Sequence, residues 1–231
     1  MKDTRVFLFA GHYGSGKTNI AVNFAFHLKA KGKRVTVADL DIVNPYFRTK
    51  DSERELRAAG IDLICSEYAN TNLDIPALPS ETYSLVTRDD VYAVFDVGGD
   101  DRGALALGRY VPAIKEEGRY EMYFVVNFAR PLTPGAEDAL EIMREIETAA
   151  GLSFTGIINN TNIGHETTQE TVLASLEKAE HLSALASLPI VMTTVEQSLA
   201  ASFTDQEIPD MFPIRLQAKY FDIGRSSVWQ N

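Results

Sequence analysis

The sequence predicts a single α/β domain, residues 1–231, with a mostly parallel central sheet of about seven strands and helices on both faces. Short β-branched or aromatic runs alternate with longer segments of helical periodicity, as expected when crossover helices connect parallel strands. No internal repeat, low-complexity tract or Pro/Gly/Ser linker divides the chain. Its 231 residues suit one well-buried domain better than two small ones.

Strands are predicted wherever a short apolar run is followed by a loop or helix signal. These segments are Val6–Ala10, Arg34–Asp39, Ile61–Cys65, Val91–Val97, Met122–Asn127, Phe154–Asn159 and Pro189–Met192. The first apolar run, near the amino terminus, is too short for a signal-peptide core or a membrane span. We therefore expect a cytoplasmic protein without a membrane anchor.

Helices are predicted over Gly16–Lys31, Pro134–Ala150 and Thr167–Ala186. The first has apolar residues every three or four positions and ends at Gly32. The second has Thr133 as its cap, a proline in its first turn and Gly151 at its end. The stretch Glu67–Asp90 is less regular, and we expect an irregular connection or a partner surface there.

The composition is that of an acidic globular protein with a packed core. Hydrophobic residues make up 45% of the chain and charged residues 23%. The 22 Lys and Arg against 32 Asp and Glu give a net charge of -10, which disfavours nonspecific attraction to nucleic acid. We therefore expect no specific nucleic-acid partner. The single Cys65 cannot form an internal disulfide, and its apolar surroundings favour a buried small side chain over a reactive thiol.

Residues 11–18 carry the strongest chemical signal. The run Gly11-His12-Tyr13-Gly14-Ser15-Gly16-Lys17-Thr18 fits the P-loop pattern of a glycine, four residues and Gly-Lys-Ser/Thr, between a predicted strand and helix. The glycines let successive N–H groups converge on phosphates at the positive end of the helix. Lys17 is expected to neutralise the β- and γ-phosphates of ATP, and Thr18 to place its hydroxyl on Mg²⁺. The predicted nucleotide site comprises these residues and the adjoining Asn19.

Two carboxylates, Asp39 and Asp41, close the second predicted strand. Ligands of open α/β sheets bind at the carboxyl ends of the strands. Asp41 is the sharper candidate, because a carboxylate there can orient the attacking water or a water on Mg²⁺. Changing Asp41 to Asn should then abolish turnover and spare nucleotide affinity. The alternative is that the pair caps the loop Ile42–Tyr46 by side-chain hydrogen bonds.

A third carboxylate, Asp96, ends the buried-strand pattern that begins at Val91 and is followed by Val97-Gly98-Gly99. This reads as a Walker B strand, in which Asp96 holds Mg²⁺ through water. We then expect the Gly99 N–H to contact the γ-phosphate. The acidic stretch Asp100–Gly103 is expected to change conformation when this contact forms, as a switch. The alternative is an ordinary turn at a strand end.

The strand ending at Asn159 leads into Asn160-Thr161-Asn162, whose side-chain amides can pair with the edge of a purine. Asparagine is also common in turns, so the pattern alone leaves both possibilities open. The histidines show no metal spacing, and His27 and His181 fall within predicted helices as surface or packing residues. No metal other than Mg²⁺ is expected.

Taken together, Gly11–Thr18, Asp39-x-Asp41, Asp96-x-x-Gly99 and Gly156-Ile157-Ile158-Asn159-Asn160 resemble the MinD/ParA and nitrogenase iron protein class of P-loop ATPases, over most of the chain. The resemblance implies Lys17 and Thr18 as phosphate and Mg²⁺ ligands, Asp41 as the switch I carboxylate, Asp96 as the Walker B residue and Asn160 as the adenine contact.

The chain departs from this class at position 12. Many members have a second lysine there that reaches across an ATP-bridged dimer, whereas this chain has His12. The resemblance to dimerising members is therefore incomplete. The carboxyl end, Lys219–Asn231, also lacks the long basic amphipathic face of a MinD membrane tether.

The leading functional hypothesis is an ATPase switch, in which bound ATP orders the loops after Asp41 and Asp96 and changes affinity for a protein partner or a second copy. The alternative is a biosynthetic enzyme resembling dethiobiotin synthetase or cobyrinic acid amide synthases, which phosphorylates a small carboxylate. Its second pocket would need anchors such as Arg48, Arg102 and Arg109. A nucleotide-binding module with little turnover is the third possibility.

Overall fold

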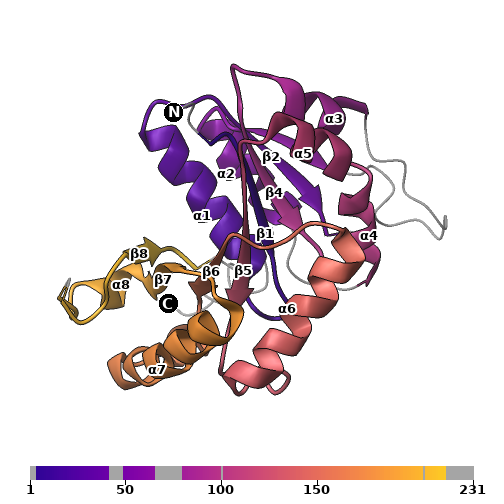
Figure 1. Ribbon diagram of the computed structural model, residues 1–231. Helices are drawn as coiled ribbons and strands as arrows, with labels where there is room; N and C mark the ends of the chain where they lie inside the picture. Colours follow the sequence, from indigo (N-terminus) through magenta and orange to yellow (C-terminus); the bar gives the residue numbers. More distant parts are fainter. Residues whose placement is uncertain (1–3, 42–48, 66–79, 100, 205, 217–231) are drawn as a thin grey trace, which may run out of the picture.

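The computed structural model describes residues 4–41, 49–65, 80–99, 101–204 and 206–216 (Figure 1). One sheet of eight parallel strands runs through them in the order β3-β2-β4-β1-β5-β6-β7-β8. The strands are β1 Val6–Ala10, β2 Val35–Leu40, β3 Asp62–Cys65, β4 Tyr92–Val97, β5 Tyr120–Val126, β6 Gly156–Asn159, β7 Ile190–Glu196 and β8 Met211–Ile214.

Helices and short 3₁₀ turns connect the strands. They are α1 Lys17–Ala30, η1 Thr49–Ser52, α2 Glu53–Ala58, α3 Ser80–Thr87, α4 Asp101–Gly108, α5 Val111–Glu117, α6 Ala136–Ala150, η2 Gly164–Glu166, α7 Gln169–Ala186 and α8 Gln197–Ala200. None of these described helices combines the length and the apolar character needed to cross a membrane.

The predicted α/β fold with a parallel sheet is confirmed, and each predicted strand forms at its expected place. The sheet has one strand more than expected. The additional strand, β8, has four residues and contains Pro213, and it lies at the sheet edge. Proline cannot donate to a strand ladder, so this segment lacked the sequence pattern of a strand.

The predicted helices begin later than expected. Helix α6 starts at Ala136 with Gly135 before it, because the Thr133 hydroxyl donates to the Asn127 carbonyl (2.7 Å) and does not cap the helix. The expected end is correct, since Gly151 follows in the left-handed conformation. The region predicted to be irregular is partly helical: residues 66–79 lie outside the described part, but α3 follows and buries Leu85.

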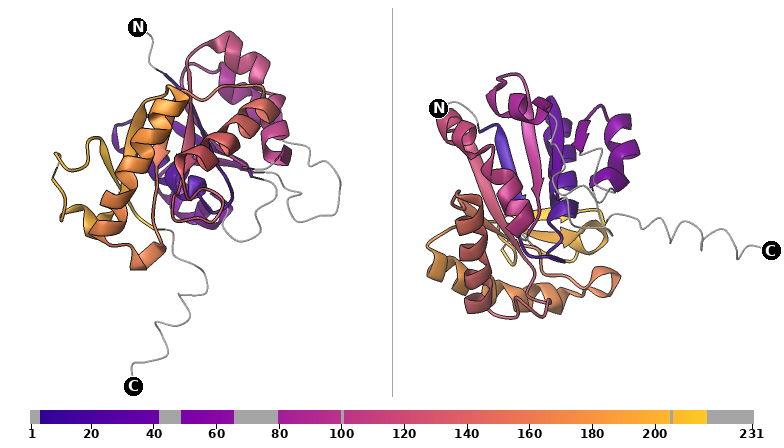
Figure 2. Two further views of the ribbon diagram at one scale, coloured as in Figure 1. Left: turned by 60° about the horizontal axis from the view of Figure 1, so that its bottom comes forward. Right: turned by 90° about the vertical axis from the view of Figure 1, so that its right-hand side faces the viewer.

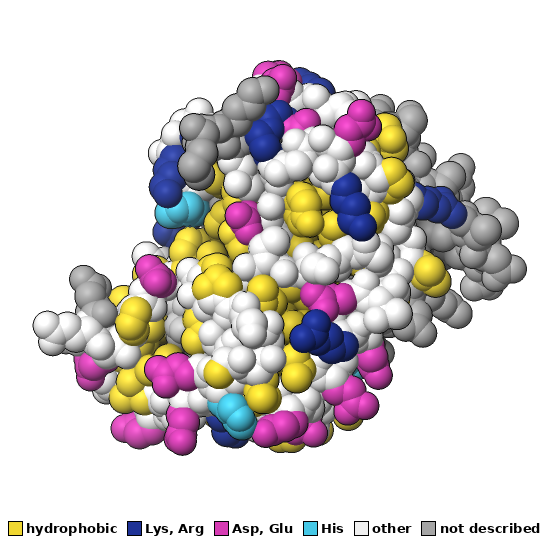
Figure 3. All heavy atoms as spheres, viewed as in Figure 1, with side chains coloured by type: hydrophobic (Ala, Val, Ile, Leu, Met, Phe, Trp, Pro, Cys, Tyr) yellow, Lys and Arg dark blue, Asp and Glu magenta, His cyan; other side chains and the backbone are white. Residues whose placement is uncertain are grey.

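Helices cover both faces of the sheet (Figure 2), and apolar side chains fill the layer beneath them on each face. Helices α1 and α2 pack on one face, where Ile20, Phe24 and Leu56 meet alternate strand residues. The other face is covered by α3 to α7, with Leu107, Ile114 and other buried side chains. Acidic side chains are prominent in Figure 3 along the outer surface of α6 and α7. This surface is unsuited to polyanions.

The remaining expectations for single residues are mostly met. His27 packs against the Phe212 ring, and His181 is exposed on α7. Cys65, which we expected to be buried, is only partly buried at the end of the edge strand β3, where one side lacks a neighbouring strand.

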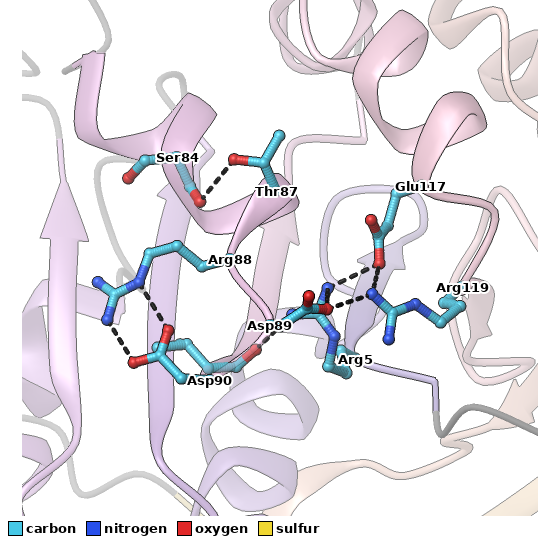
Figure 4. Close-up of polar contacts among 9 residues, drawn as sticks. Arg5, Ser84, Thr87, Arg88, Asp89, Asp90, Glu117 and Arg119 are labelled. Atoms are coloured by element: carbon cyan, nitrogen blue, oxygen red, sulfur yellow. Dashed lines mark hydrogen bonds and ion pairs between the residues drawn. The ribbon is translucent and has the colours of Figure 1, made fainter.

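A charged cluster closes the amino-terminal edge of the sheet (Figure 4). Arg5 is buried, and its guanidinium donates to the Val91 carbonyl (3.1 Å) and to Glu117 (2.7 Å). Arg119 pairs with Glu117 and, at 2.6 Å, with Asp89. Buried charges need such partners, so the cluster fixes β1 against the start of β4 and the end of α5.

Replacing Arg5 with Ala should therefore destabilise the fold. We expect a loss of about 2 kcal/mol in the free energy of unfolding, because a buried carbonyl and a carboxylate lose charged donors. The matched control is Arg34→Ala, which removes an exposed pair with Asp90 and should change little. Urea unfolding of the three proteins makes the comparison, and equal losses in both variants would contradict the assigned role of Arg5.

Candidate functional site

The predicted site residues meet at the carboxyl edge of the sheet. Strand β1 leads into residues 11–18, and its neighbour β4 carries Asp96. Strand β2 lies on the other side of β4, with Asp39 directly opposite Asp96. Because all three strands are parallel, the phosphate loop and the carboxylates come from adjacent strand ends.

The phosphate loop has the backbone that a phosphate cradle requires. Gly14 and Gly16 have φ values of 81° and 86°, which side chains other than glycine rarely adopt. Gly16 precedes the first turn of α1 without a side-chain cap. The N–H groups of Gly16, Lys17 and Thr18 have no acceptor among the described residues. The positive end of the helix is therefore directed at the loop.

Lys17 is held in a buried ion pair. Its Nζ lies 2.7 Å from Asp41 Oδ2, and the two side chains are only 4% and 5% exposed. Burial acts to lower the pKa of Lys17, but attraction to Asp96 and Asp41 outweighs it, so the pKa is raised. Lys17 is thus a fixed positive charge at the base of the loop.

Asp96 is the most buried of the carboxylates. Its Oδ2 accepts a hydrogen bond from the Thr49 hydroxyl (3.0 Å), and its Oδ1 is buried with no hydrogen-bond partner among the described residues. Burial raises the pKa of Asp96, although Lys17 and hydrogen bonds from Thr18 and Thr49 oppose the shift. An unsatisfied carboxylate oxygen near the Thr18 hydroxyl suits a hard cation and its water shell. Among the described residues, no cluster of three or more His, Cys, Asp or Glu forms a separate metal site.

Asp39 has a local role. Its Oδ1 accepts the Asp41 backbone N–H (3.0 Å), which stabilises the turn at the end of β2. The same bond helps to place Asp41 beside Lys17. Whether the pair also caps the loop that follows, the alternative that the sequence left open, stays a prediction. The loop Ile42–Tyr46 lies outside the described residues.

Gly99 lies directly against the phosphate loop. A Cβ at this position would collide with the Gly11 carbonyl oxygen and lie 3.0 Å from the His12 Cα. Only glycine permits this approach. The predicted contact between the Gly99 N–H and a γ-phosphate stays a prediction, and residue 100 of the predicted switch is outside the described part.

Asn160 is buried and braces the loop. Its Nδ2 donates to the Ser15 carbonyl (2.6 Å), and its Oδ1 accepts from the Thr194 hydroxyl (2.5 Å). Both ends of the amide are thus engaged by the protein, and the predicted adenine contact stays a prediction. A pocket adjoins it, lined in part by residues 160–162 and 194–196. Thr194 carries no local sequence signal, because its partner is distant along the chain.

The other predicted residues surround the loop. His12 Nδ1 donates to the Tyr13 carbonyl (3.1 Å), and the Tyr13 ring is 56% exposed. Asn19 lies in the first turn of α1, where its carbonyl accepts from Asn23 (2.8 Å). Arg109 is exposed between α4 and α5. The side chains of Arg48 and Arg102 are outside the described part.

One cation beside the loop was not among the predicted site residues. Arg130, in the turn after β5, donates from Nε to the Gly14 carbonyl (2.9 Å). The signal available in the sequence was its position just past a predicted strand, at the edge where the phosphate loop lies.

Gly16 should tolerate no side chain. A Cβ there would collide with Asn160 Nδ2. Gly32 is the matched control, because its φ is 76° and nothing lies within 4 Å of its Cβ position. We expect Gly32→Ala to cost about 1 kcal/mol from backbone strain alone, and Gly16→Ala to cost about 3 kcal/mol. Chemical unfolding followed by circular dichroism measures both, and equal costs would show that the Asn160 contact does not constrain the loop.

Comparison with solved structures supports the fold. FtsY from Mycoplasma mycoides has a TM-score of 0.55 at 17% identity, over 83% of this chain and 60% of its own. The cell division protein FtsY from Thermotoga maritima has a TM-score of 0.54 at 18% sequence identity, over 84% of this chain and 63% of its own. FtsY from Elizabethkingia anophelis, a signal recognition particle receptor in complex with GDP, has a TM-score of 0.50 at 16% sequence identity. The match covers 84% of this chain and 58% of its own. The chain spans less than two thirds of the length of each.

The family is shown by sequence. No protein with a curated description matches the chain. The family model of the CobQ/CobB/MinD/ParA nucleotide binding domain, CbiA, matches residues 6–203, from β1 to just beyond α8. This range includes the phosphate loop, the three strand-end carboxylates Asp39, Asp41 and Asp96, and Asn160. The chain therefore belongs to the CobQ/CobB/MinD/ParA nucleotide-binding domain family.

Proposed function

We propose that this protein is a Mg²⁺-dependent ATPase that acts as a nucleotide switch on a protein partner or on a second copy of itself. The observation that carries the proposal is the buried Lys17–Asp41 pair beside Asp96, at the base of a phosphate loop whose N–H groups have no described acceptor. A buried lysine with two carboxylates, next to a helix amino terminus, is the arrangement expected of phosphate chemistry.

Phosphate binding requires Lys17 to change partner. In the structure, its ammonium pairs with Asp41 at 2.7 Å. The phosphate chain of ATP would compete for that ammonium, because charged hydrogen bonds to phosphate are strong. Asp41 is then released to orient the attacking water. The same exchange links occupancy of the loop to the conformation of the chain that follows Asp41.

The residues present fit a magnesium ion. Thr18 would ligate it through its hydroxyl, and Asp96 would hold it through water, using the Oδ1 that has no partner within the described residues. When bound, Mg²⁺ would supply positive charge that offsets the charge of the phosphates. Asp41 remains our candidate for a further water-mediated contact.

The base is assigned to adenine on the resemblance of Asn160 to the adenine contact of related ATPases. The Asn160 amide is already bonded to Ser15 and Thr194. Contact with the base would therefore use the donor and acceptor capacity that this amide has left. One structural neighbour, FtsY from Elizabethkingia anophelis, was solved with GDP. Titrations with ATP and GTP, each with Mg²⁺ or EDTA, therefore test the assignment. Tighter binding of GTP would overturn it.

Hydrolysis is tested by Asp41→Asn. We expect this variant to keep nucleotide affinity, because Lys17 and the loop N–H groups remain, and to lose turnover at least tenfold, because a neutral amide cannot accept a proton from water. The control is Asp62→Asn, an exposed carboxylate on β3, which should hydrolyse like the parent protein. Phosphate release under excess ATP gives the rates, and undiminished turnover in Asp41→Asn would remove Asp41 from the mechanism.

The switch is tested by solution mass. We expect light scattering to detect a larger species with Mg²⁺ and a non-hydrolysable ATP analogue, and none with ADP, if a second copy recognises the ATP state. An unchanged mass with both nucleotides would exclude the second copy and direct the search to a different protein. An unchanged mass with turnover that depends on an added small carboxylate would favour the biosynthetic alternative.

A further inference from the structure

Arg130 lies along the phosphate loop. Its Nε donates to the Gly14 carbonyl at 2.9 Å. A Cβ on Gly14 would be 3.5 Å from Nε, 3.6 Å from Cδ and 3.9 Å from Cζ of Arg130. The arginine side chain therefore rests on the backbone of Gly14, where the absence of a side chain leaves room for it.

The guanidinium keeps most of its donors unused. An arginine offers five N–H donors, and only Nε is bonded here. Within the described ranges, the Arg130 side chain forms no ion pair and no other hydrogen bond. Several other arginines do pair with carboxylates, including Arg5, Arg34, Arg57, Arg88, Arg119 and Arg144. In a chain with a net charge of -10, an exposed arginine without a carboxylate is a local attraction for anions.

An ordered turn presents Arg130 to the loop. The Asn127 carbonyl accepts the Arg130 N–H (3.1 Å) and the Thr133 hydroxyl (2.7 Å). The Asn127 side chain accepts the Ala129 N–H (3.0 Å). These bonds fix the turn between β5 and α6, so the backbone position of Arg130 is set by the framework and only its side chain has to adjust to a ligand.

The topology places this turn where ligands bind. Strands β1 and β5 are neighbours. The chain leaves β1 through α1, which packs on one face of the sheet, and leaves β5 through α6, which packs on the other. Connections diverge in this way at the topological switch point, outside the carboxyl ends of the strands, where open α/β sheets bind their ligands.

We propose that Arg130 is a second phosphate-binding cation, which contacts the phosphate chain of the nucleotide held in residues 11–18. It supplies a second cation beside a loop in which position 12 is a histidine and not a lysine. Guanidinium matches phosphate geometry with two parallel N–H donors, and the free Nη atoms provide them. The inference rests on the proposed nucleotide binding and adds a residue to that site.

The test compares Arg130→Ala, Arg130→Lys and Arg144→Ala with the parent protein. Arg144 is the control because it is an exposed arginine on α6 whose described ion pair, with Glu147, lies away from the loop. Calorimetric titrations with Mg²⁺-ADP and a non-hydrolysable Mg²⁺-ATP analogue are run at several salt concentrations. We expect Arg130→Ala to weaken binding about tenfold or more and Arg144→Ala to leave it unchanged. Arg130→Lys keeps the charge but loses the parallel N–H donors of the guanidinium, so its affinity should lie between those of Arg130→Ala and Arg144→Ala.

Salt dependence separates a phosphate contact from a structural brace on Gly14. Losing a cation that binds phosphate makes affinity fall less steeply with salt than in the parent protein, because less attraction remains to be screened. The inference would be overturned if Arg130→Ala bound nucleotide more weakly but with the parent's salt dependence, or bound it with the parent's affinity. Either outcome would leave the proposed function intact. A parent protein that binds neither nucleotide would overturn both. Thermal melting of all variants checks that the fold is unchanged.

Discussion

The Lys17–Asp41 pair beside Asp96 is the constraint on which the rest of the site depends. Three ionisable groups share a region from which water is almost excluded, and the single ammonium faces two carboxylates. Charges buried in this way are stable only with close partners. Asp96 lies on β4, Asp41 follows β2, and Lys17 begins the helix after β1, so the parallel order of β2, β4 and β1 is what makes the cluster possible. Removing Lys17 alone would leave the carboxylates without their described cation.

The phosphate loop is constrained on two sides by close approaches. On the side of β4, Gly99 allows the backbone to meet Gly11. On the side of β5 and β6, Asn160 reaches the Ser15 carbonyl, and Arg130 rests on Gly14. A phosphate site gains from such preorganisation, because the N–H groups need no reordering when the ligand arrives. The carboxylates therefore act on one flank of the loop, and the amide and guanidinium act on the other.

Much of the fold and part of the site could be predicted from sequence. The central strands are buried on both faces and read as continuous apolar runs, and the glycine pattern of residues 11–18 is local. Asp41 and Asp96 were found because each follows or ends such a run. The contacts of Asn160 and Arg130 with the loop join residues 145 and 116 positions apart, and no local pattern encodes them. Strand β8 was missed for a different reason, since Pro213 removes a ladder donor at the sheet edge.

Asn160 also connects the phosphate loop to the far half of the sheet. Its amide joins the Ser15 carbonyl to Thr194 of β7, and Asn162 Nδ2 in turn donates to the Asn160 carbonyl (2.8 Å). The pocket between residues 160–162 and 194–196 is therefore built on the same side chain that positions the loop. A base bound there and a phosphate bound in the loop would share one rigid support. A ligand that carries both parts would then meet a support that is already ordered by the bonds of Asn160 to Ser15 and Thr194.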